Sequence, residues 1–193
     1  MKEHRAPRGR VVGLGKRIVI QIYAMTTPED AEMVAALGAD HVGLLAWTKP
    51  SLKPILSIQR ARKIFGGVRG LVKTVVIPVS HKKEEIVEIA SRIEPDYIQV
   101  ASYPEYLDFN SFVELADSLH SIGIKVIRVI PVDGYDSLNL AMKYERVSDV
   151  IMTDSAGGPP FPHVSGFVGG TGKLHDLTVS AEIRRRIRRP LIL

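Results

Sequence analysis

The residues best suited to chemistry lie between Asp149 and Asp176. The segment begins with an apolar run that predicts a buried strand, and this run ends at the carboxylate of Asp154. A loop rich in glycine and proline follows and closes at residues 169–173, where a helical pattern starts. Loops at the carboxyl ends of parallel strands hold the ligands in α/β proteins. An acid at such a strand end, followed by a glycine-rich loop, therefore predicts a reaction site.

Asp154 and the loop each allow two interpretations. The carboxylate either acts as a general acid or caps the turn that follows it. The loop is either a lid whose backbone amides bind an anionic ligand or a flexible connection. We predict the functional role in both cases. The loop residues predicted to bind the ligand are Gly169, Gly170, Thr171, Gly172 and Lys173.

Three other polar residues stand within or beside apolar runs. We predict that Tyr23 donates a hydrogen bond in the site; the alternatives are a perturbed proton acceptor and a core aromatic residue with a bonded hydroxyl. A free phenol has a pKa near 10, so only about one in a thousand is ionised at pH 7. Gln99 and Arg128 either face the centre of the fold and bind the ligand or are buried with hydrogen-bonded partners. Both alternatives stay open, and we count the two among the candidate ligand-binding residues.

The composition indicates one globular domain. The chain has 193 residues, of which 45% are hydrophobic, and its mean hydropathy is +0.07. No apolar run approaches the roughly 18 residues of a membrane span, and the basic start of the chain lacks the apolar centre of a secretory signal. We therefore expect a cytoplasmic protein without membrane contact. The chain has no cysteine, which excludes disulfides and thiolate chemistry.

Basic residues are concentrated near both ends of the chain, and the net charge is +5. Such charges form solvated faces or attract anionic ligands such as phosphates. No zinc spacing, aromatic RNA-binding signature or helix-turn-helix pattern supports nucleic acid as a partner. The six histidines show no paired metal-ligand spacing. We therefore predict no metal and no other cofactor.

Strand and helix patterns alternate along the chain. Apolar, β-branched runs predict strands at residues 17–25, 41–47, 71–79, 96–101, 125–132, 149–153 and 190–193. Helical spacing of apolar residues predicts helices at residues 27–37, 57–64, 82–93, 110–122, 138–147 and 175–187. This alternation predicts a parallel sheet with helical crossovers, either doubly wound or closed as a (β/α)8 barrel. The even spacing, and the lack of a dinucleotide-binding glycine motif after the first strand, favour the (β/α)8 TIM barrel.

Several segments match a known series of motifs in order: QIYAMT (21–26), PEDA (28–31), GADHVG (38–43), IQVAS (98–102), DVIMTDS (149–155) and GGTGKLHD (169–176). Together they resemble the phosphoribosylanthranilate isomerase family, which are (β/α)8 barrels of tryptophan biosynthesis. The resemblance extends over roughly residues 17–193. Its most specific part is the G-G-T-G-K-x-x-D motif in register after the acid.

The resemblance implies an isomerase that carries out an Amadori-type aldose–ketose isomerisation of a phosphoribosyl amine. Asp154 would be the general acid that protonates the ribose ring oxygen, and a base would then remove the neighbouring C2′ proton. Tyr23 occupies the place of the family's cysteine base, and Ala101 that of a histidine. The family's serine–arginine segment is echoed only loosely at residues 51–53. Loss of a positioned base lowers a rate by about 10²–10⁴-fold, so the alternative is a non-catalytic or repurposed barrel that binds a phosphorylated small molecule or a protein partner.

The expected domains are a basic arm at residues 1–16 and a barrel at residues 17–193. A closed barrel needs an eighth strand, and the phosphate sites of such barrels lie in the loops after strands 7 and 8. We expect the chain to be part of a longer folded product that carries these units. A natural remnant and completion by a second subunit are the alternatives. The expected partner is a phosphorylated small-molecule substrate, and a homo-oligomer is compatible with the fold.

Overall fold

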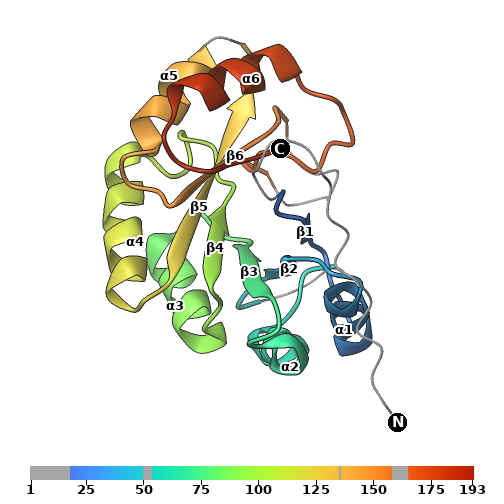
Figure 1. Cartoon of the computed structure of the whole chain (residues 1–193). Coiled ribbons are helices and arrows are strands. Elements are labelled where there is room, and N and C mark those ends of the chain that lie inside the picture. Colours follow the sequence, from blue (N-terminus) through green and yellow to red (C-terminus); the bar gives the residue numbers. More distant parts are fainter. Residues whose placement is uncertain (1–17, 50–53, 135, 158–164) are drawn as a thin grey trace.

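A single parallel sheet forms the centre of the computed structural model, which describes residues 18–49, 54–134, 136–157 and 165–193 (Figure 1). The predicted arm at residues 1–16 and the segment at residues 51–53 lie outside the described residues. The sheet has seven strands in sequence order. They are β1 (Gln21–Ile22), β2 (His41–Ala46), β3 (Lys73–Pro78), β4 (Tyr97–Val100), β5 (Lys125–Val132), β6 (Val150–Ser155) and β7 (Leu191–Ile192).

A helix joins each strand to the next one, and every neighbouring pair of strands is parallel. Figure 1 shows the sheet curled, with the helices on its outer side. The helices are α1 (Pro28–Ala36), α2 (Ile58–Val68), α3 (Lys83–Ile93), α4 (Phe109–Ser121), α5 (Asp136–Tyr144) and α6 (Leu177–Arg186). This arrangement confirms the predicted α/β class with helical crossovers.

Capping side chains fix the starts of several helices. Thr27 accepts a hydrogen bond from the backbone of Asp30 at 3.1 Å, and Pro28 opens α1. Asp176 caps α6 in the same way by accepting from the backbone of Thr178 at 2.8 Å. A cap of this kind contributes about 1 kcal/mol because it satisfies an otherwise unpaired amide. The cap at Asp176 therefore marks the end of the loop that contains the glycine-rich motif.

The structure changes the predicted ends of the two strands that carry the candidate catalytic residues. In β1, only Gln21 and Ile22 pair with β2, and β1 has no other neighbour among the described strands of the sheet. An edge strand is held on one side only, so the pairing is shorter than the predicted strand at residues 17–25. β6 continues beyond its predicted end and includes Asp154 and Ser155. The acid therefore belongs to the strand itself, which gives it a fixed direction.

Alternate residues of each strand face opposite sides of the sheet. Along β5, Val126 and Ile130 belong to the outer core between sheet and helices, whereas Ile127 and Val129 belong to an inner cluster. The inner cluster contains residues from strands and loops, and no residue of a described helix. Burial of each such side chain contributes about 1.5–3 kcal/mol. Inward-facing side chains continue along the strands to their carboxyl ends, which form the mouth of the curled sheet.

The described helices include none with both the length and the apolar character that a membrane crossing requires.

Candidate functional site

A cavity of about 270 Å³ lies at the carboxyl ends of the strands. Most of its wall is apolar and comes from Leu45, Ile55, Ile77, Val79, Met152 and Phe167. Its polar side chains are those of Tyr23, Gln99 and Asp154, which come from three different parts of the sheet. Parallel strands place their ends at one edge of the sheet, and this brings the three together.

Asp154 points into this cavity from the end of β6 and is half-buried. One of its oxygens, Oδ1, accepts a hydrogen bond from the backbone of Ser155 at 2.7 Å. Its other oxygen lies against the backbone of Gly169, where a Cβ atom would overlap the carboxylate. Gly169 also has a φ of +86°, which side chains with a Cβ rarely adopt. The close approach requires glycine here and restricts the carboxylate to a narrow range of positions.

Tyr23 lies directly after β1 and lines the same cavity, although 52% of its surface is exposed. The next residue, Ala24, also lines the cavity and has a φ of +66°. A residue with a Cβ in this left-handed region stores roughly 1–2 kcal/mol of strain. Two residues after Tyr23, the amide of Met25 donates to the carbonyl of Gly43 on β2 at 3.1 Å. The two residues predicted to be catalytic, Tyr23 and Asp154, therefore face one cavity.

Gln99 lines the cavity and at the same time has a hydrogen-bonded partner, so both sequence-based alternatives describe it in part. Its Oε1 accepts from the Nε2 of Gln21 at 2.9 Å, and the Nδ1 of His41 lies 3.2 Å from the Oε1 of Gln21. Burial lowers the pKa of His41, which favours its neutral form. This chain of amides fixes the side chain of Gln99 beneath the cavity.

Arg128 does not face the centre of the curled sheet, which corrects the prediction that it could reach the ligand there. Strand alternation gives the inward positions of β5 to Ile127 and Val129, so Arg128 points outward. Its Cζ atom lies 5.1 Å from the ring centre of Phe112 on α4 and 4.3 Å from that of Tyr144 at the end of α5. Arg128 is fully buried there and is absent from the cavity wall.

The glycine-rich loop only partly reaches the cavity. Gly169 and Gly170 line it, whereas Gly172 and Lys173 are exposed and lie outside the lining. The amide of Gly169 donates to the carbonyls of Ser155 and Gly157, both at 3.1 Å. This amide is therefore already bonded, and the predicted role of the loop as an anion-binding lid stays a prediction.

Thr171 ties the glycine-rich loop to the end of β6. Its hydroxyl lies 2.5 Å from that of Ser155 and also accepts from the backbone of Lys173 at 3.0 Å. Thr171 thus holds the loop against β6, and it does not line the cavity. Sequence reasoning did not anticipate this bond, and it also missed Phe167, which forms one wall of the cavity.

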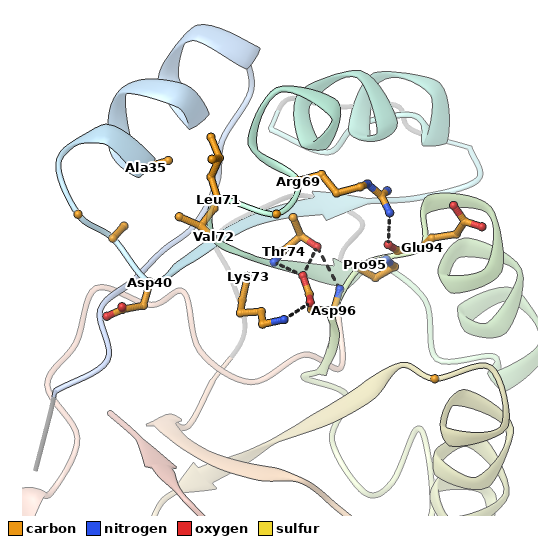
Figure 2. Close-up of a pocket in the computed structure, with 14 residues that line it drawn as sticks. Ala35, Asp40, Arg69, Leu71, Val72, Lys73, Thr74, Glu94, Pro95 and Asp96 are labelled. Carbon is orange, nitrogen blue, oxygen red and sulfur yellow. Dashed lines mark hydrogen bonds and ion pairs between the residues drawn. The ribbon is translucent and has the colours of Figure 1, made fainter. Parts of the chain in front are cut away.

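A larger hollow of about 450 Å³ lies at the opposite, amino ends of the strands (Figure 2). Figure 2 shows Lys73 bonded to Asp96, and Arg69 bonded to the backbone carbonyl of Glu94. The Nζ of Lys73 lies 2.7 Å from the Oδ1 of Asp96, whose Oδ2 accepts from the backbone and hydroxyl of Thr74. Burial would raise the pKa of Asp96, but the bonds from Lys73 and Thr74 outweigh burial and lower it.

The guanidinium of Arg69 donates to the carbonyls of Ile93 and Glu94 at the end of α3. These contacts tie the ends of α2 and α3 together, and the bonds of Lys73 and Thr74 to Asp96 tie the starts of β3 and β4 together. In the described ranges, no cluster of His, Asp and Glu could hold a metal ion.

No family model matches the chain, but curated proteins of one name are similar to it over most of its length. The N-(5′-phosphoribosyl)anthranilate isomerase of Methanocella arvoryzae is 32% identical over 174 residues, which cover 90% of this chain and 75% of the relative. The enzyme of the same name from Haloferax volcanii is 26% identical, with 90% of this chain and 71% of the relative covered.

Solved structures give the same result for the fold. The phosphoribosyl anthranilate isomerase of Thermotoga maritima has a TM-score of 0.67 at 24% identity, with 91% of this chain and 77% of that chain covered. That of Thermus thermophilus has a TM-score of 0.65 at 19% identity, with coverage of 90% and 74%. A third, with a TM-score of 0.57, 23% identity and coverage of 72% and 66%, contains reduced 1-(o-carboxyphenylamino)-1-deoxyribulose 5-phosphate. These similarities confirm the (β/α)8-type architecture, of which the seven strands form a curled, open part.

Proposed function

The chain belongs to the phosphoribosylanthranilate isomerase family, and we propose that it catalyses the reaction after which its relatives are named, the isomerisation of N-(5′-phosphoribosyl)anthranilate. One observation carries the proposal: Asp154 and Tyr23 line a single cavity at the carboxyl ends of the strands. The apolar wall suits the aromatic ring of such a substrate, and the polar side chains suit its sugar.

In the proposed reaction, Asp154 gives its proton to the ribose ring oxygen. The bond between this oxygen and C1′ breaks, and the nitrogen lone pair forms a C1′=N Schiff base. Removal of the C2′ proton then gives an enol, and protonation at C1′ with loss of the enol proton gives the ketose. The product is an isomer of the substrate, so atoms and electrons balance without an oxidant or reductant.

In this proposal Asp154 carries both proton transfers, and Tyr23 supplies a hydrogen bond that assists the second one. The carboxyl group of Asp154 is fixed between Ser155 and Gly169 and, in its protonated form, serves as the general acid. The phenol of Tyr23 hydrogen-bonds to the oxygen on C2′, which promotes loss of the C2′ proton. After protonating the ring oxygen, Asp154 is a carboxylate that can accept this proton. A Tyr23→Phe variant separates the two roles, because it removes the hydroxyl and leaves the acid in place.

The test is the rate at which the purified protein converts N-(5′-phosphoribosyl)anthranilate to the ketose. We expect turnover that falls by at least about 100-fold in Asp154→Asn, since a positioned acid typically contributes 10²–10⁴-fold. Asp117→Asn is the matched control, because Asp117 is exposed on α4 and outside the cavity. Equal turnover in Asp154→Asn and Asp117→Asn contradicts the proposal.

A second candidate function is supported by the tyrosine in place of the family's cysteine. A barrel without its base could bind a phosphorylated sugar or a protein partner without converting the ligand. This alternative predicts that the unmodified chain binds the reduced product analogue but has no turnover. If Tyr23→Cys then gains turnover, the native chain is the binding protein and not the isomerase.

A further inference from the structure

The segment from Ser165 to Gly169, here called the mouth segment, follows β6 but attaches to the end of β4. Phe167 forms an antiparallel bridge with Ser102. The amide of Val168 donates to the carbonyl of Ala101 at 2.7 Å. Phe167, Val168 and Gly169 all line the cavity. The mouth segment is therefore a wall of the site built between distant parts of the chain.

His81, in the connection between β3 and α3, contacts this wall from outside the cavity lining. Its Nε2 lies 2.9 Å from the carbonyl oxygen of Ser165, and its Nδ1 lies 2.8 Å from the hydroxyl of Ser102. Its ring stacks on that of Phe167, with 4.2 Å between the ring centres. The other side-chain contact is with Tyr106, at 4.8 Å between ring centres.

The two hydrogen bonds define the tautomer of His81. A carbonyl can only accept, so Nε2 carries a proton and donates to Ser165. In the neutral ring Nδ1 accepts from the hydroxyl of Ser102, and burial lowers the pKa of His81, although the bond to Ser165 opposes this. A histidine beside a serine can also activate a nucleophile. Ser102 is only 1% exposed and cannot reach a substrate, so the pair holds the mouth segment instead.

The mouth segment in turn holds the acid. The amide of Gly169 donates to the carbonyls of Ser155 and Gly157, which follow directly from the end of β6. The backbone of Gly169 then lies against the Asp154 carboxylate with no room for a Cβ atom. Movement of the mouth segment would therefore change the orientations that this carboxylate can adopt.

We propose that His81 is a positioning residue for the reaction, which it serves by clamping the mouth segment to the end of β4 so that Gly169 keeps Asp154 directed into the cavity. The role rests on the proposed function of the cavity. It requires both features of the imidazole: the donor to Ser165 and the ring face against Phe167.

Two variants separate these features. His81→Gln keeps a donor for Ser165 and loses the ring, whereas His81→Phe keeps a ring and loses both hydrogen bonds. His120→Gln is the matched control, because His120 bonds Asp149 at 2.8 Å before the amino end of β6. Amide hydrogen exchange at Val168 and Gly169 reports the clamp, and kcat and KM for N-(5′-phosphoribosyl)anthranilate report its effect.

Loss of one neutral hydrogen bond corresponds to roughly a two- to tenfold change, so loss of the two bonds of His81 corresponds to about a 4- to 100-fold change. We expect His81→Phe to speed exchange at Val168 and Gly169 by about that factor and to lower kcat by a similar factor with little change in KM. His81→Gln should recover part of kcat, and His120→Gln should match the unmodified protein.

Unchanged exchange in His81→Phe overturns the proposal, whatever the activity of the protein. Faster exchange with unchanged kcat also overturns it, because the clamp then does not position the acid. If the unmodified protein has no turnover, the proposed function fails instead. Amide exchange at Val168 and Gly169 then decides for His81: faster exchange in His81→Phe supports the clamp, and unchanged exchange overturns it.

Discussion

Replacement of Arg128 by methionine should stabilise the protein. Arg128 is fully buried in the outer core, and its Cζ lies over the rings of Tyr144 and Phe112. None of its three side-chain nitrogens has hydrogen-bond geometry with a described residue, although the nearby hydroxyl of Tyr144 opposes the effect of burial on the pKa of Arg128. A buried charge without hydrogen bonds is disfavoured relative to an apolar side chain of similar shape.

The size of the effect follows from the burial of the guanidinium. Burial lowers the pKa of Arg128 to about 10, and this corresponds to roughly 3 kcal/mol against the charged form. The contacts with the two rings offset roughly 1–2 kcal/mol of that cost. We therefore expect Arg128→Met to raise the free energy of unfolding by about 1–2 kcal/mol. Because only the charged form is disfavoured, the gain is complete at pH values well below 10 and shrinks as the pH rises through 10.

Urea unfolding at pH 7 measures this gain. Arg69→Met is the contrasting variant, because Arg69 donates to the carbonyls of Ile93 and Glu94, and its loss should destabilise by about 1 kcal/mol. Turnover should not change in Arg128→Met, since Arg128 does not line the cavity. A loss of about 1 kcal/mol or more in Arg128→Met would refute the reasoning, because the guanidinium would then have a stabilising partner.

Three further substitutions follow from single contacts. Ala24→Gly removes the strain of a φ of +66° and should raise the urea midpoint by the equivalent of about 1 kcal/mol; a lower midpoint would argue against strain at this turn. Gly169→Ala places a Cβ atom on the Asp154 carboxylate and should abolish most turnover, whereas Gly38→Ala, with φ +98° but open space around it and outside the cavity lining, should retain turnover; equal kcat values in the two variants would contradict the close approach. Asp96→Asn should reduce stability by about 1 kcal/mol at pH 7, and because the pKa of Asp96 is lowered, this difference should disappear as the pH falls below the ordinary aspartate value near 4; urea titrations at pH 7 and pH 3 that give the same difference would refute the assignment.

Much of the fold could be predicted from the sequence because its signals are local. Apolar strands alternating with amphipathic helices require a parallel sheet with crossovers, and Thr27 and Pro28 mark the start of α1 as predicted. Asp154 and the glycines after it could likewise be placed at the end of a strand. The sequence signals of a strand and of a turn come from residues that are neighbours in the chain.

The direction of Arg128 could not be read in the same way. β5 is apolar on both of its faces, so the pattern does not reveal which alternate residues face inward. The role of His81 was also hidden, because its bonds reach Ser102 and Ser165, which are far away in sequence. Such contacts depend on how the loops cross the mouth of the sheet, and no local spacing encodes that.

A crystal structure of the protein with reduced 1-(o-carboxyphenylamino)-1-deoxyribulose 5-phosphate would test most directly whether Asp154 and Tyr23 act together. The account predicts that the sugar carbons lie between the carboxylate and the phenol, with the aromatic ring against the apolar wall near Phe167. A ligand bound elsewhere, or a Tyr23 side chain turned away from the bound sugar, would contradict it.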